Sequence, residues 1–577
     1  KNITGLHVSV NLHGLTLDLL QRRQTGRGVY LSPSENLKVK LNGLLNKRRK
    51  KMKKLKELRK TKSSSSAYLR STMTTSNSYA HLGWSLSTGD VNADGIDDLI
   101  IGAPGYSFPG NPQSGAIFIV FGRNDGRLPQ LLDLDKQANV TLYGTNYSNN
   151  SHFGTAVALL DMNQDGVDDL AVSAPSSGSA SLNYTGAVHI YLAKSPGRFG
   201  STPNVTVICK SRYCNLGWSL ATADLNQDGF RDLIIGSPFV ANGNQPQSGA
   251  LWVVNSSKEI SVKREISVEV DATLLLKGDQ QYGWLGYSVL TQPKLKGQGS
   301  WVLVSQPTYR LCANPQCSFS TNDVQSVGRL LVYNSTDMIK PVKILTGIEA
   351  FGKLSSSFAI GDPYDNGQEL IGVGSDTIDI HGTIADLPVT FAQAGNVNLF
   401  DLRSSQHGKR HKDPFRKFRR YLEESVEEPP VSVFEGDRGL ERFGKSLLLK
   451  DVTGDKIDDV IIGAPLRIDD LTEELFEGEQ GAVFVFKGGA SLPRGNVTRG
   501  CNRLDQNIEP CPTDKAFAVL SNGESGSRFG HQLAVWQTGT TQNLVISAPR
   551  SNIRSRLSGA IFMYSGFNKN ENGKRTK

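Results

Sequence analysis

The chain has 577 residues, including 59 glycines, with 21% charged and 8% aromatic residues. This composition is typical of a turn-rich globular protein and excludes a disordered chain. The length exceeds one ordinary hydrophobic core, unless the architecture grows by adding repeated units. No stretch approaches about 18 consecutive apolar residues, so no membrane-spanning helix is predicted.

The net charge of +9 is concentrated in two short tracts. Residues 47–62 contain 11 Lys or Arg against one acid, and residues 409–420 contain 7 against one. The tracts carry +10 and +6, which leaves −7 on the remainder, so the folded body is mildly acidic and no nucleic-acid partner is predicted. We interpret the tracts as solvated linkers. Contact with a heparin-like polymer or an anionic membrane is the next alternative, and nuclear targeting is the last.

The first 75 residues do not share the pattern that follows them. Residues 1–45 begin with a moderately apolar stretch and are predicted to be the tail of an upstream domain. Residues 46–75 are predicted to form a basic helix and a serine-rich linker. Because no signal-peptide pattern precedes the repeats, we expect a fragment or a processed form.

One unit is repeated seven times between residues 76 and 566, and a basic tail follows at 567–577. Each unit has a glycine turn, a short strand, a second strand ending in a Gly-Ala-Pro-like motif, and a third strand such as residues 117–121. The spacing leaves room for four short strands per unit, with inserted loops in units five and six, where the second basic tract falls. The pattern predicts an all-β fold, a seven-bladed β-propeller, with turn glycines Gly83, Gly154, Gly217, Gly286, Gly352, Gly444 and Gly530.

Acidic loops of one design lie between the first two strands of the first three units. Ca²⁺ takes six to eight oxygens, which alternate residues of a tight loop can supply, and a glycine at position 6 permits the sharp turn. Positions 1, 3, 5 and 9 would provide side chains and position 7 its carbonyl. The predicted ligands are Asp90, Asn92, Asp94, Ile96 and Asp98; Asp161, Asn163, Asp165, Val167 and Asp169; and Asp224, Asn226, Asp228, Phe230 and Asp232.

An EF-hand and an acidic turn without metal are the two alternatives to this calcium loop. An EF-hand requires a bidentate Glu at position 12 and a following helix, whereas position 12 here lies in a β-branched strand. An acidic turn without metal fits one isolated loop, but three near-identical copies favour calcium.

The remaining units differ from this design. The sixth replaces the Asn by Thr and the glycine by Lys, so a weaker site or none is predicted from Asp451, Thr453, Asp455, Ile457 and Asp459. The fifth has Asp362, Asp365 and Asn366 in what reads as a shortened turn, and the fourth and seventh lack the acidic pattern. These three units are predicted to bind no metal.

Cysteines and glycosylation motifs indicate an oxidising compartment. Six cysteines form three local pairs without zinc-site spacing, so disulfides are predicted for Cys209–Cys214, Cys312–Cys317 and Cys501–Cys511. Asn-x-Ser/Thr acceptors are frequent, which together with the disulfides favours a secreted, extracellular protein. The predicted glycosylation sites are Asn139, Asn146, Asn149, Asn183, Asn204, Asn255, Asn334 and Asn496.

No self-contained active site is visible in the sequence. The nine histidines include no metal-binding pair such as HExxH, and most are expected at the surface. Neither a Gly-x-Ser-x-Gly elbow nor a phosphate-cradling glycine loop occurs. No catalytic residue is therefore predicted.

The repeat resembles the FG-GAP repeat of integrin alpha-chain propellers. A closer resemblance, to the C-terminal half of glycosylphosphatidylinositol (GPI)-specific phospholipases D, rests on residues 100–107, 213–218, 464–468 and 556–560. This resemblance implies a secreted enzyme that hydrolyses the inositol-phosphate linkage of GPI anchors. It also implies GPI-anchored proteins and lipoprotein or membrane surfaces as partners. In that family an N-terminal Zn²⁺ domain performs the hydrolysis. Its ligands map to nothing here, and residues 1–45 would be at most its tail.

An adhesion propeller of integrin type is the alternative function. Against it, the chain has no Ig-like module or membrane span after the seventh unit. The lysine-rich residues 47–62 are not explained by either resemblance.

Overall fold

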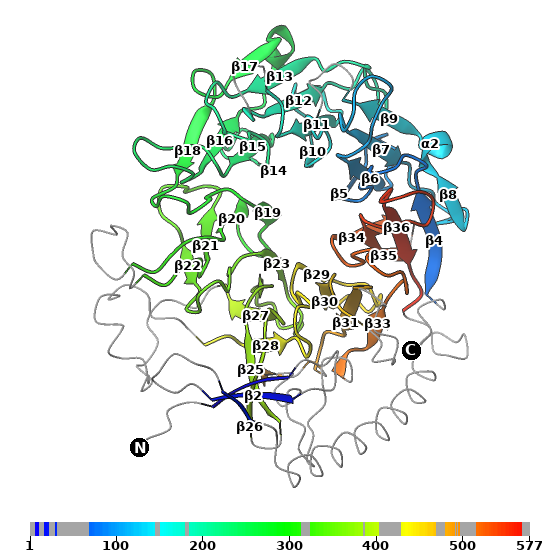
Figure 1. The fold of residues 1–577 in the computed structure, drawn as a ribbon. Coiled ribbons are helices and arrows are strands. Elements are labelled where there is room, and N and C mark those ends of the chain that lie inside the picture. The colour runs from blue at the N-terminus through cyan, green and yellow to red at the C-terminus, as the bar shows by residue number, and fades with distance from the viewer. Residues whose placement is uncertain are drawn as a thin grey trace.

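The structure, a computed structural model, describes residues 6–10, 17–21, 29–31, 68–144, 150–178, 184–312, 323–384, 387–402, 429–468, 479–490, 492, 494–496, 515–539 and 541–567. Seven sheets, each with four strands in antiparallel pairing, surround a central axis (Figure 1). The chain is thus a seven-bladed β-propeller, as the repeat predicted. The first strands of neighbouring blades lie side by side around the axis.

The first four blades follow one another along the chain, and blade 2 gains a fifth strand that pairs in parallel at its edge. Their strands are as follows. Blade 1 contains β5 (Ser85–Gly89), β6 (Asp98–Ala103), β7 (Ala116–Val120) and β9 (Val140–Tyr143). Blade 2 contains β10 (Val157–Leu160), β11 (Asp169–Ala174), β12 (Ala187–Tyr191), β13 (Val205–Ile208) and β17 (Glu265–Ser267). Blade 3 contains β14 (Ser219–Ala223), β15 (Asp232–Ser237), β16 (Ala250–Val254) and β18 (Thr273–Lys277). Blade 4 contains β19 (Val289–Pro293), β20 (Ser300–Gln306), β21 (Arg329–Asn334) and β22 (Lys343–Thr346).

The other three blades complete the ring, and blades 5 and 7 also gain a parallel edge strand. Blade 5 contains β23 (Ser357–Gly361), β24 (Leu370–Ser375), β27 (Asn396–Asp401), β28 (Ser432–Glu435) and β32 (Gly495–Asn496). Blade 6 contains β29 (Ser446–Lys450), β30 (Asp459–Ala464), β31 (Ala482–Phe486) and β33 (Ala518–Leu520). Blade 7 contains β34 (Leu533–Thr538), β35 (Thr541–Ala548), β36 (Ala560–Tyr564), β4 (Leu69–Thr74) and β8 (Leu131–Asp133).

The ring is closed by strands from opposite ends of the chain. β4 pairs antiparallel with β36, so the blue and red strands lie side by side in Figure 1. Tyr68 also stacks on Phe567, with 4.7 Å between the ring centroids. The propeller therefore begins at β4, before the predicted boundary at residue 76, and Phe567, one residue past the predicted end, still packs against it.

Few elements lie outside the blades in the described residues. β1 (Leu6–Val10), β2 (Leu17–Gln21) and β3 (Val29–Leu31) form a small antiparallel sheet. It contacts β26 (Leu387–Phe391), which pairs with β25 (Ile380–Ile384) in a hairpin inserted into blade 5. The only helical pieces described are α2 (Leu134–Gln137) and the 3₁₀ turn η2 (Lys258–Val262). The predicted basic helix and the tract at residues 409–420 lie outside the described residues.

Blade packing follows from the apolar runs and the small residues. The second strand of blade 1, β6, and its third strand, β7, are buried along their whole length. Such strands read as continuous apolar runs because both faces of the sheet are covered by neighbouring blades. A Cβ added to Gly102 in β6 would lie 2.1 Å from the carbonyl oxygen of Gly154. The Gly-Ala-Pro glycine is therefore the point where the next blade's turn approaches the strand.

The turn glycines have positive φ, for example +90° at Gly154, except in the fifth unit. There Gly352 has no positive φ, and Ser355 takes the turn position with a φ of +75°. The backbone of Leu354 approaches Gly328 as that of Phe153 approaches Gly115. The prediction of Gly352 as a turn glycine was wrong, because the Phe-Gly pair lies three residues before the structural turn.

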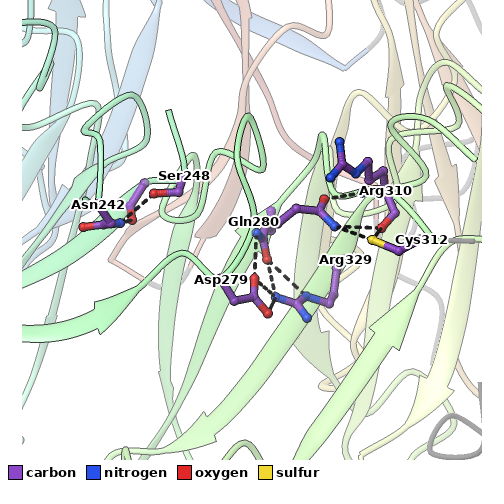
Figure 2. Close-up of polar contacts among 9 residues, drawn as sticks. Asn242, Ser248, Asp279, Gln280, Arg310, Cys312 and Arg329 are labelled. Carbon is purple, nitrogen blue, oxygen red and sulfur yellow. Dashed lines mark hydrogen bonds and ion pairs between the residues drawn. The ribbon is translucent and has the colours of Figure 1, made fainter. Parts of the chain in front are cut away.

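One buried and one partly exposed ion pair hold the loops at the end of the ring where the glycine turns lie. In blade 6, Arg467 is 1% exposed and pairs with Glu441, which is fully buried, and with Asp437 at 2.7 Å. Glu441 also accepts the N–H of Arg438 at 3.0 Å. Between blades 3 and 4, Arg329 binds both carboxylate oxygens of Asp279, at 2.7 and 2.8 Å (Figure 2).

Replacing Glu441 by Gln is expected to lower the free energy of unfolding by about 2 kcal/mol, measured by urea denaturation. The buried guanidinium of Arg467 would lose a charged partner and retain Asp437. Asp125→Asn provides the control, because its pair with Arg123 is exposed and contributes little. Equal stability of the two variants would contradict the role assigned to Glu441.

Candidate metal centres

The first three acidic loops share one hydrogen-bond arrangement. In blade 1 the Asp94 N–H donates to Asp90 Oδ1 at 3.1 Å and to Asn92 Oδ1 at 3.0 Å. The Gly95 N–H donates to the other Asp90 oxygen at 2.8 Å. The corresponding bonds occur in blades 2 and 3. The oxygens of positions 1 and 3 therefore converge on a single nitrogen in each loop.

Backbone conformation explains the glycine of these loops. Gly95, Gly166 and Gly229 have φ between +82° and +92°. An added Cβ would meet nothing within 4 Å at any of them. Glycine is required here by the left-handed conformation and not by lack of space.

The aspartate at position 9 is the first residue of the second strand and is fully buried in all four loops. Asp98 Oδ2 accepts the N–H groups of Val91 and Asn92, and Oδ1 accepts that of Gly122 at 2.8 Å. These bonds tie the acidic loop to the end of the third strand. The position-9 carboxylate is thus a structural residue of the blade, and most of its acceptor capacity is already used.

Burial raises the pKa of Asp98 to about 6 and that of Asp169 to about 7, although backbone N–H groups oppose the shift. Burial also raises the pKa of Asp232. Burial disfavours the charged form of these carboxylates, and a nearby cation would favour it. A bound Ca²⁺ would supply that charge.

The donor chemistry of these loops fits a hard cation. Asp, Asn and main-chain oxygens are ligands that Ca²⁺ prefers, and the loop oxygens at positions 1 and 3 already lie close together. Within the described residues, however, no three His, Cys, Asp or Glu side chains form a group that could hold a metal. Ligation would require position 5 to turn from its own loop, where Asp94 Oδ1 accepts the Ile96 N–H at 2.9 Å, toward the ion.

The sixth loop has a different internal arrangement. Lys487 Nζ lies 3.1 Å from Asp455 Oδ2, so a lysine already neutralises the position-5 carboxylate. Thr453 is 3% exposed and turns inward, with its hydroxyl 3.4 Å from Asp459. Sequence analysis missed Lys487, which follows the third strand and is distant from the loop along the chain.

The fifth loop is not shortened, contrary to the prediction. β23 ends at Gly361 and β24 begins at Leu370, the same spacing as between β5 and β6. Asp362 accepts the N–H groups of Asn366 and Gly367, as Asp90 does in blade 1. Tyr364 and Leu370 occupy positions 3 and 9, so two of the four side-chain oxygens are missing.

Position 8 of the loops faces the neighbouring blade. Asp458 of blade 6 accepts the N–H of Asp362 in blade 5 at 2.8 Å. In blade 2, burial raises the pKa of Asp168, and the charge of Arg231 from blade 3 opposes the shift. These residues connect adjacent loops, a role that spacing within one loop does not indicate.

Some of the predicted disulfide and glycosylation residues lie in the described part of the chain. Cys209 and Cys214 are bonded to each other, as predicted. Cys312 is disulfide-bonded, while Cys317, Cys501 and Cys511 lie outside the described residues. Asn139, Asn204 and Asn255 are exposed, Asn334 is half-buried, and Asn496 lies in β32. Asn146, Asn149 and Asn183 lie outside the described residues.

One of the nine histidines lies in the core of a blade. His189 is buried in β12, and burial lowers its pKa to about 3, so the expectation of surface histidines fails there.

Among the described residues, no helix is long and apolar enough to cross a bilayer.

The fold and the loops define an FG-GAP propeller. The FG-GAP repeat model matches residues 82–120, 153–191 and 216–254, which cover the first three strands and the acidic loop of blades 1 to 3. The chain is 37% identical to phosphatidylinositol-glycan-specific phospholipase D of Bos taurus and to that of Homo sapiens, over 490 residues each. These matches cover 84% of this chain and 55% of each relative. The chain therefore spans about half the length of the curated relatives it matches.

Integrin alpha chains are similar over a smaller part. Integrin alpha pat-2 of Caenorhabditis briggsae is 29% identical over 239 residues, which cover 39% of this chain and 18% of that protein. The similarity to the phospholipases D extends over much more of the chain.

Proposed function

We propose that this chain is the propeller portion of a secreted GPI-specific phospholipase D-like protein, and that three of its blades bind calcium. The similarity to the bovine and human enzymes over 84% of the chain supports this proposal. The hydrolysis would belong to a Zn²⁺ domain in the remainder of such a protein. We assign no catalytic residue to the propeller.

Calcium would act structurally in this function. Asp90, Asn92, Asp94, Asp98 and the carbonyl of Ile96 would hold the ion in blade 1. Asp98 also accepts the backbone N–H groups that tie the loop to the third strand. The ion would neutralise carboxylates packed close to the axis and stiffen the edges of the blades. GPI-anchored proteins and lipoprotein or membrane surfaces are the proposed partners.

The proposed function is tested by release of a GPI-anchored reporter from membranes. The chain alone is expected to release none, and the protein encoded with its upstream sequence is expected to release it. A zinc chelator should abolish the release, since the ion would activate the attacking water. Release by the chain alone, or an upstream sequence without His and Asp zinc ligands, would overturn the proposal.

An integrin-like adhesion propeller is the second candidate, favoured only by the partial similarity to integrin alpha chains. Calcium-dependent binding of the chain to immobilised matrix proteins would support it, and absence of such binding would remove it.

A further inference from the structure

A cluster of basic side chains lies at the glycine-turn end of blades 6 and 7. Arg442 and Arg528 precede their turn glycines by two residues, and both have a φ of +58°. Lys445 and His531 directly follow those glycines, and Arg550 follows the proline that ends the second strand of blade 7. The repeat thus brings five cationic or titratable groups to one side of the axis.

Local contacts fix the turns that carry this basic cluster. The Lys445 N–H donates to the Arg442 carbonyl at 3.1 Å, and the Arg550 N–H donates to the carbonyl of Ser527 at 3.1 Å. The His531 ring lies 5.1 Å from that of Trp84 in blade 1. The Arg442 and Lys445 side chains are 28% and 33% exposed, so the cluster is half-buried.

Three nitrogens of the cluster are buried without a hydrogen-bond partner: Arg442 Nε, Arg528 Nε and His531 Nδ1. A buried donor without an acceptor costs about 1–3 kcal/mol, and more when it is charged. Such groups are rare in folded proteins and often indicate a missing water or ion. Two charged donors in one place call for an acceptor that carries negative charge.

Two carboxylates face the cluster and compensate it only in part. Asp376 Oδ2 lies 3.7 Å from Arg442 Nη1 and 3.9 Å from Lys445 Nζ, longer than hydrogen bonds. Glu479 interacts electrostatically with Arg528. Among the described residues, the four cations Arg442, Lys445, Arg528 and Arg550 face two carboxylates, which leaves a net charge of +2 in this half-buried region.

The electrostatic environment agrees with this count. Burial, followed by the charges of Arg550 and Arg442, lowers the pKa of Arg528, and Glu479 opposes this shift. Burial, with Lys445 and Arg528 nearby, lowers the pKa of His531 to about 3, so the imidazole is neutral at pH 7. Burial also lowers the pKa of His81 in blade 1, with Arg550 and Arg528 contributing.

Blades 3 and 4 provide a contrast within the same ring. There Asp279 binds the Arg329 guanidinium (Figure 2). Gln306 Oε1 also accepts a hydrogen bond from Arg329 Nε at 3.1 Å. The Arg329 guanidinium is thus satisfied by side chains of its own blades. Arg442 and Arg528 lack such saturation.

We propose that the basic cluster of Arg442, Lys445, Arg528, His531 and Arg550 binds the phosphoryl group of an anionic ligand. Guanidinium groups present several donors in a planar fork, which matches the oxygens of a phosphate. Partial burial strengthens this attraction relative to an exposed patch. The inference does not depend on the proposed hydrolase function, since it concerns binding by this chain alone.

The test is binding of inorganic phosphate and of inositol 1-phosphate to the 577-residue chain by isothermal titration, and flotation with phosphatidylcholine vesicles containing phosphatidylinositol. R442Q and R528Q are each expected to weaken binding about tenfold or more, because each removes a charged hydrogen bond. R556Q is the matched control, since Arg556 lies at the same end over the Tyr79 ring but outside the cluster. Thermal unfolding in chloride buffer checks that the variants are folded. If R442Q or R528Q does not fold, K445Q takes its place in the binding test.

Binding of the soluble phosphates that is lost in R442Q or R528Q but kept in R556Q would support the site and identify a soluble ligand. Binding only to the vesicles, with the same loss in the variants, would support it with a lipid headgroup as the source. Absence of binding to all three probes, or binding unchanged in both arginine variants, would overturn the proposal.

Discussion

Chelation of calcium is expected to lower the thermal unfolding temperature of this chain, and readdition of calcium to restore it. Each loop that binds calcium in the folded state alone stabilises the fold by RT ln(1 + [Ca²⁺]/Kd). At a calcium concentration about tenfold above Kd this is about 1.4 kcal/mol per site, so three sites contribute about 4 kcal/mol. Extracellular modules of this kind have Kd values of about 10⁻⁴–10⁻³ M.

Single substitutions assign the effect to individual loops. Asp94→Asn, Asp165→Asn and Asp228→Asn are each expected to remove one bound calcium, counted by titration calorimetry or metal analysis. Asp455→Asn is the matched control, because Lys487 already neutralises that carboxylate in blade 6. A stability that does not depend on calcium, or an equal loss in the control, would contradict the assignment of the loops.

Gly102→Ala is expected to lower the free energy of unfolding by about 3 kcal/mol in chemical denaturation. The new Cβ would lie 2.1 Å from the Gly154 carbonyl oxygen and 2.2 Å from Ser85 Oγ. The same Ser85 hydroxyl donates to that carbonyl at 2.9 Å, so the substitution would also disturb an inter-blade hydrogen bond. Gly236 in blade 3 is in the same position, with the Gly286 carbonyl oxygen 2.3 Å from an added Cβ.

Gly352→Ala is the control for this prediction. Gly352 has no positive φ, and its nearest contact would be the Glu349 carbonyl oxygen at 3.2 Å, so a loss below about 1 kcal/mol is expected. If Gly352→Ala were as damaging as Gly102→Ala, the assignment of Ser355 as the turn residue of blade 5 would be wrong. Tolerance of Gly102→Ala would contradict the close approach of the blades.

The seven-bladed fold could be predicted because the strands are local and repeated. Each unit carries its own apolar strands, turn glycine and Gly-Ala-Pro-like motif, so the period alone indicates how the sheets are arranged. The chain closure was missed, because the residues of β4 have no repeat signature and pair with a strand almost 500 positions away. The fifth turn was misplaced because a Phe-Gly pair lies near a serine that adopts the glycine conformation.

The sequence by itself determined the repeat, the β-propeller and the acidic loops with their candidate oxygen ligands, because each depends on residues close together along the chain. Only the tertiary structure decided which charges meet across the blades. Lys487 reaches the sixth loop, and Asp458 binds the loop of blade 5. Arg442 and Arg528 come together, each with a buried Nε that has no hydrogen-bond partner. Electrostatic and hydrogen-bond partners depend on distance in space, and the spacing of residues along the chain does not give that distance.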